Sequence, residues 1–91
     1  MAFVKQDIDF VQYSWDMEDE VAGALFSGAP SRRIFDPLNG HQVLFLINYY
    51  AMLTGQFRPE DAHLMENRLV HKLPLGKMSE LSVIRWMTLN K

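Results

Sequence analysis

The longest apolar run in the chain is VLFLINYYAML, from Val43 to Leu53, and only Asn48 interrupts it. Its length, and its position after the turn-forming pair Asn39-Gly40, predict a helix over about residues 40–54. Apolar side chains cover more than one side of this helix, so other parts of the fold must cover it all round. The run from 43 to 53 would reach only about 16 Å, roughly half of a ~30 Å hydrocarbon core, so we expect no membrane span.

Proline and glycine residues that end or separate helices predict three further helices, over 16–27, 59–73 and 79–89. In the first of these, Ser14 or Asp16 is the expected cap, and Met17, Val21, Ala24 and Leu25 are expected on one apolar side. Residues 3–13 are ambiguous, because helical spacing of apolar residues competes with alternation over 7–10. We interpret them as a helix, with a strand as the alternative.

These elements define the fold class. We predict an all-α protein, a single small domain over 1–91 with four to five short helices. The helices are expected to form an orthogonal bundle around the central hydrophobic helix at about 40–54. The absence of cysteine excludes disulfides, thiolate metal sites and thiol nucleophiles, and with the lack of a signal-like N-terminus it favours a cytoplasmic protein.

Charge is distributed unevenly although the formal net charge is only -2. Residues 1–36 hold three basic and seven acidic side chains, and residues 37–67 hold one basic and three acidic. Residues 68–91 hold five basic side chains and one acidic. An acidic front and a basic tail suit either internal pairing or head-to-tail contact with a partner, while ordinary solvated surfaces are the simpler explanation.

The apolar central helix predicts protein–protein interaction, because a chain this short can barely cover it. We expect a homodimer whose self-contact uses Leu44, Ile47, Tyr50 and Ala51, or the opposite side of that helix. Arg32 and Arg33, in a predicted exposed loop, are candidates for binding a partner's carboxylate or another anion. The identity of the protein partner is left open.

The C-terminal third supports an alternative, a helix-turn-helix-like transcriptional regulator. The helix at about 79–89 would then enter the DNA major groove, with Lys77, Ser79, Ser82 and Arg85 near bases and phosphates. Residues 74–78 make a longer connection than the usual turn, and the sequence pI of about 5.8 is low for a DNA-binding domain. Nucleic acid is therefore the less favoured partner.

The usual catalytic and cofactor motifs are missing from the sequence. There is no nucleophile elbow, no phosphate-binding glycine loop and no dinucleotide fingerprint, so we expect neither an enzyme nor a cofactor. Glu60 and His63 have the spacing of one di-iron ligand pair, but the chain lacks the second pair, so no metal is expected. The sequence thus predicts a small regulatory or adaptor protein, with an acidic decoy built on residues 16–20 as a minor alternative.

Overall fold

Gly40–Thr54 form α2, the central helix of a computed structural model that describes residues 3–8, 13–56, 58–74 and 76–89. The helix begins where the Asn39 side chain accepts a hydrogen bond from the Gln42 backbone N–H at 3.3 Å. It ends at Gly55, whose left-handed φ of 72° is the conformation that glycine adopts without strain. The predicted helix over 40–54 is therefore confirmed, with both ends set by local capping.

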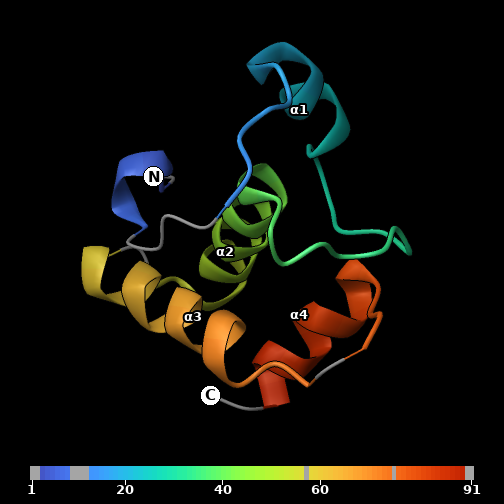
Figure 1. The fold of residues 1–91 in the computed structure, drawn as a ribbon. Helices are drawn as coiled ribbons and strands as arrows, with labels where there is room; N and C mark the ends of the chain where they lie inside the picture. The colour runs from blue at the N-terminus through green and yellow to red at the C-terminus, as the bar shows by residue number, and fades with distance from the viewer. Residues whose placement is uncertain (1–2, 9–12, 57, 75, 90–91) are drawn as a thin grey trace.

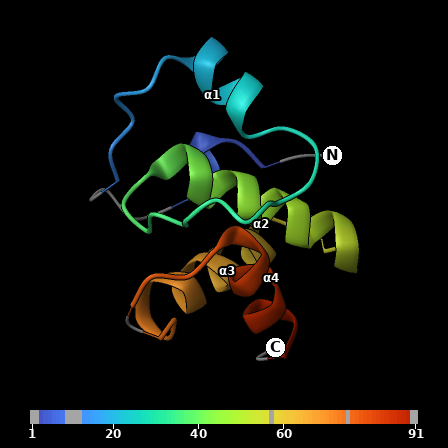
Figure 2. The ribbon, with the colours of Figure 1, turned by 90° about the vertical axis from the view of Figure 1, so that its right-hand side faces the viewer.

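The other described helices are η1 (Lys5–Asp7), α1 (Asp19–Leu25), α3 (Pro59–His71) and α4 (Glu80–Leu89). Helices α3 and α4 both pack against α2, and η1 packs against α3. Figures 1 and 2 show α1 at one end of the molecule and α3 with α4 at the other, with α2 between them. The described residues thus form a single helical globule with four α-helices, whereas the orthogonal arrangement stays a prediction.

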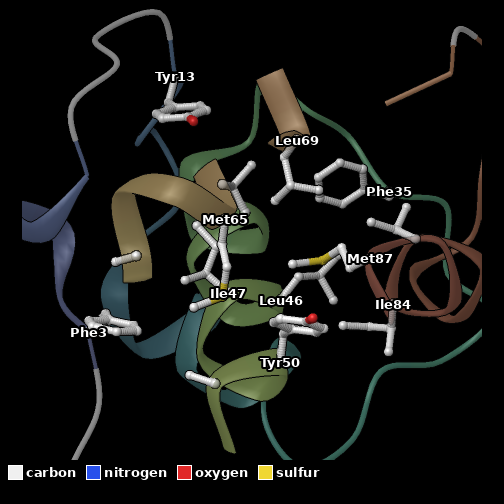
Figure 3. Packing of buried hydrophobic residues seen from close by; sticks show 14 residues of the cluster. Phe3, Tyr13, Phe35, Leu46, Ile47, Tyr50, Met65, Leu69, Ile84 and Met87 are labelled. Atoms are coloured by element: carbon white, nitrogen blue, oxygen red, sulfur yellow. The ribbon is translucent and has the colours of Figure 1, made fainter. Parts of the chain in front are cut away.

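The core lies around α2. In Figure 3, Leu46, Ile47 and Tyr50 of α2 meet Met65 of α3 and Met87 of α4. All five side chains are at most 2% exposed. Phe3, Tyr13, Phe35, Leu69 and Ile84 complete the labelled cluster. Much of the apolar surface of α2 is therefore covered within one chain, by its two neighbouring helices and by the segments around Phe3 and Phe35.

The predicted helices over 59–73 and 79–89 are confirmed as α3 and α4. Both begin at capping or proline residues that the local sequence contains. Pro59 occupies the first turn of α3, and Asp61 accepts a hydrogen bond from the Arg58 backbone N–H at 3.1 Å. In α4, the Ser79 hydroxyl oxygen accepts from the Ser82 backbone N–H at 3.2 Å. These contacts involve residues three apart, so sequence alone can predict them.

The helix predicted over 16–27 is shorter in the structure, because the segment just before it pairs with a distant part of the chain. The Ser14 backbone N–H donates to the Leu38 carbonyl at 2.7 Å, and its carbonyl accepts from the Gly40 N–H at 3.0 Å. The Ser14 hydroxyl donates to the Asp16 carboxylate at 2.9 Å, so neither expected cap serves the helix. Residue 14 is thereby held against the start of α2, and α1 begins only at Asp19.

The continuous helix favoured over residues 3–13 is wrong for the described part, where only the three-residue η1 is helical. Residues 9–12 lie outside the described residues. Asn48, the polar interruption of the apolar run, explains why Phe3 is not helical: its side chain accepts from the Phe3 N–H and donates to the Phe3 carbonyl at 3.0 Å. An asparagine that pairs with backbone across the fold replaces the local bonds of a helix.

Candidate functional site

The outward side of α1 carries the surface that we treat as the candidate functional site. Val21 is 51% exposed and Leu25 is 45% exposed, and Ala24 beside them is also exposed. Glu20, Val21, Ala24 and Leu25 line a shallow hollow of about 500 Å³. Together with exposed Glu18, these residues are called the α1 face. It combines apolar side chains with acidic neighbours and no basic ones.

The inward side of α1 determines which residues face solvent. Ala22 is buried, and the Phe26 ring at the end of α1 stacks on the Phe45 ring of α2 with centroids 5.9 Å apart. Val21, Ala24 and Leu25 line the same hollow, as the predicted apolar side implies. That side faces solvent, because Ala22 and Phe26 face α2 instead.

Arg33 fixes the C-terminal end of α1 to the rest of the protein. Its Nη1 donates to the Leu25 carbonyl at 2.7 Å, and its guanidinium carbon lies 4.9 Å from the centroid of the Phe26 ring. A cation at a helix C-terminus is favoured by the helix dipole, and contact with an aromatic ring adds to that attraction. Arg33 therefore holds both the last turn and the stacking ring of α1.

Glu80, the first residue of α4, holds Arg33 in turn. Its side chain is fully buried, and its Oε2 lies 3.2 Å from the Arg33 Nε, close enough for an ion pair although not aligned as a hydrogen bond. Oε1 accepts from the Ser31 backbone N–H at 3.0 Å and from its hydroxyl at 3.3 Å. The Glu80 backbone N–H also donates to the Arg33 carbonyl at 2.9 Å. A buried carboxylate is tolerated when it is surrounded by donors in this way.

Gln42 completes this buried polar cluster from α2. Its amide nitrogen donates to Glu80 Oε2 at 2.8 Å and to the Ile34 carbonyl at 3.0 Å. Its amide oxygen accepts from the Asp36 backbone N–H at 2.7 Å. Both hydrogens and the oxygen of the buried amide are therefore used, as burial requires. The segment 31–36, which leads from α1 to α2, is fixed by side chains of α2 and α4.

Most of the α2 residues predicted to contact a second copy are buried within their own chain. Ile47 and Ala51 are 0% exposed and Tyr50 is 2% exposed, so they fill the core of their own chain and offer no surface. Leu44 is partly buried beside Phe26 and Phe45 in a hollow of about 350 Å³ between α1 and α2. The structure thus removes most of the predicted self-contact surface, because neighbouring helices and loops already cover it.

The two loop arginines also differ from each other. Arg32 is exposed, as the predicted loop position implies. Arg33 is not available to a partner's carboxylate in the way we expected, because its ion pair with Glu80 is internal. Little in the sequence predicts this pairing, and the one signal is that Glu80 is the only acidic residue in 68–91.

The residues of the nucleic-acid alternative lie near one another around α4. Lys77, Ser82 and Arg85 are exposed, and Ser79 is partly buried, with its hydroxyl 3.0 Å from that of Ser82. Leu81 and Leu89 are exposed beside them, at 48% and 76%. Lys77, Leu81, Ser82, Arg85 and Leu89 are called the α4 face. Glu80, the first residue of the same helix, is buried and is not part of this surface.

Tyr13 and Glu66 form a second buried polar contact, between the N-terminal segment and α3. The Tyr13 hydroxyl donates to Glu66 Oε2 at 2.8 Å, and the whole Glu66 residue is 1% exposed. Burial of the phenol, and then its hydrogen bond to the nearby carboxylate, raise the pKa of Tyr13 well above its ordinary value. Glu66 therefore has a structural role, because it holds the N-terminal segment to α3.

Among residues 3–8, 13–56, 58–74 and 76–89, no three His, Asp or Glu side chains are grouped so that they could hold a metal ion. In the same part of the chain, no helix has both the length and the apolar character needed to cross a membrane. Comparison with known protein families, curated proteins and solved structures finds no match.

Proposed function

We propose that this chain is a non-enzymatic domain that acts through protein–protein interaction, in a regulatory or adaptor role, and that it associates with a second copy of itself. The observation that supports this proposal is the α1 face. Helix α1 lies at one end of the molecule (Figure 1), and it carries the half-exposed Val21 and Leu25 with the exposed Glu18 and Glu20 close in sequence. A cytoplasmic location and an orthogonal packing of the helices remain predictions from the sequence.

Helix α1 leaves apolar surface uncovered on its outward side. Burying the remaining exposed parts of Val21 and Leu25 against a partner would stabilise a complex by about 1 kcal/mol per side chain. The buried cluster of Glu80, Gln42 and Arg33 fixes the position of this helix before any partner arrives. A contact surface that is already ordered loses less conformational entropy on binding. The α1 face therefore suits association better than the buried residues of α2.

Light scattering over micromolar concentrations tests the self-association that this proposal includes. A mass that rises above the 10.6 kDa of one chain as concentration increases would support it. A constant mass of 10.6 kDa up to the highest concentration would contradict it.

A second candidate function is DNA binding through the α4 face, and the exposure of Lys77, Ser82 and Arg85 favours it. The packing of both α3 and α4 on α2, with residues 72–79 between them, differs from the short turn of a helix-turn-helix. Duplex binding at about 50 mM salt, lost in Lys77→Ala and Arg85→Ala, would support this candidate. No binding at that salt concentration would exclude it.

A further inference from the structure

The α4 face has the opposite electrostatic character to the α1 face and a similar apolar content. Leu81 and Leu89 are exposed, with Arg85 on the same helix and Lys77 just before it. The acidic residue of this helix, Glu80, is buried in its own chain. Within residues 76–89, the exposed charges are therefore both basic. On the α1 face, Glu18 and Glu20 are exposed and both acidic.

These two complementary surfaces do not meet within one molecule. Figures 1 and 2 place the bodies of α1 and α4 on different sides of α2, and Arg33 links the last turn of α1 to Glu80 at the start of α4. The acidic front and basic tail of the sequence thus do not neutralise each other through these two helices. Each of the two surfaces therefore has apolar side chains beside charges of a single sign. Surfaces of opposite sign can pair with each other across an interface.

We propose that the α1 face of one copy binds the α4 face of a second copy. This rests on the proposed self-association and assigns its surfaces. Val21 and Leu25 would pack against Leu81 and Leu89, while the glutamates of the α1 face approach the basic side chains of the α4 face. The contact joins two different surfaces. It can therefore form twice in a dimer with two-fold symmetry, or once between each pair of neighbours in a head-to-tail assembly.

Charge reversal with complementation tests this pairing. Glu18→Lys/Glu20→Lys makes the α1 face basic, and Lys77→Glu/Arg85→Glu makes the α4 face acidic. Each variant alone should bring like charges together and raise the dissociation constant of self-association at least ~10-fold. An equimolar mixture should associate again, because the basic α1 face of one variant meets the acidic α4 face of the other. Sedimentation equilibrium measures the mass in all three samples.

Two controls separate this contact from general effects. Gln56→Glu/Asn67→Asp/Lys72→Glu changes the net charge by the same amount as the α4 reversal, at exposed positions outside both surfaces, and should keep the wild-type mass. Circular dichroism of each variant checks folding. If charge reversal unfolds α1, Glu18→Gln/Glu20→Gln supplies a milder change that should still weaken association.

The outcomes distinguish this inference from the broader proposal. Two monomeric variants whose mixture regains the wild-type mass would support the α1–α4 contact. A wild type that associates, with both reversal variants keeping its mass, would overturn the contact but leave self-association intact. A monomeric wild type would overturn self-association itself. If that monomer binds a DNA duplex and the α4 reversal abolishes binding, the α4 face has nucleic acid as its partner.

Discussion

Arg33 Nε lies 3.2 Å from Glu80 Oε2, and the same guanidinium donates to the Leu25 carbonyl at the end of α1. The first residue of α4 thereby holds, through one arginine, the last turn of a helix at the other end of the sequence. Gln42 of α2 binds the same carboxylate. The position of the α1 face thus depends on a buried polar cluster rather than on a broad apolar contact between helices.

Glu80→Ala should lower the free energy of unfolding by about 3 kcal/mol, because it leaves buried donors and a partly buried guanidinium without their acceptor. Urea denaturation measures this change. The matched control is Glu60→Ala, which removes a carboxylate from the start of α3 that is 66% exposed and 3.5 Å from Arg58. The control should cost under about 1 kcal/mol. Equal small losses in both variants would show that the Glu80 cluster contributes little.

Arg33→Met should loosen α1 while leaving α2 intact. The substitution keeps much of the apolar stem but removes the donor to the Leu25 carbonyl and the cation beside Phe26. Amide hydrogen exchange should accelerate about 5- to 10-fold at Ala22 and Phe26, whose N–H groups bond within the α1 region, and stay unchanged in the middle of α2. Arg32→Met is the control, and similar acceleration there would refute a specific role for Arg33.

Two glycine substitutions should have opposite effects. A Cβ added at Gly40 would lie 2.5 Å from atoms of the Trp15 indole, so Gly40→Ala should destabilise the fold by about 1–3 kcal/mol. At Gly23, inside α1, an added Cβ meets nothing within 4 Å. Gly23→Ala should therefore stabilise by about 0.5–1 kcal/mol through helix propensity. Thermal denaturation compares them, and stabilisation by both would show that Trp15 does not pack on Gly40.

The raised pKa of Tyr13 predicts a loss of stability at alkaline pH. The folded state favours the neutral phenol, so the unfolded chain releases this proton first, near pH ~10. The Tyr13 contribution is complete below that pH and declines above it, by up to about 1.4 kcal/mol per pH unit. Tyr13→Phe should lack this part of the decline and lose about 1–3 kcal/mol at neutral pH. Urea denaturation at pH 9 and pH 11 measures both effects, and identical alkaline slopes would contradict the assignment.

The parts of the fold that the sequence predicts are those set by short-range contacts. Asn39 and Gly55 bound α2, Pro59 starts α3 and Ser79 caps α4, each through residues within four positions. The start of α1 escaped prediction because Ser14 pairs with the backbone of residues 38 and 40. No local pattern at Ser14 distinguishes that pairing from an ordinary helix cap.

The candidate site was only half predictable for the same reason. The spacing of Val21, Ala24 and Leu25 correctly groups them on one side of α1. Which side faces the core depends on the stacking of Phe26 on Phe45, a contact that only the folded chain reveals. Likewise, a glutamate in the first turn of a helix is usually exposed, where the helix dipole stabilises its charge. Glu80 is buried instead because segment 31–36 packs against the start of α4.

The most direct measurement of the central claim is the mass of a variant with a polar α1 face. In Val21→Gln/Leu25→Gln, glutamine keeps helix propensity while replacing exposed apolar surface. Met52→Gln/Leu53→Gln is the control, since these residues of α2 are 59% and 54% exposed. In sedimentation equilibrium, the α1 variant should remain at 10.6 kDa where wild type and control are heavier. The account is contradicted if the α1 variant associates as strongly as wild type.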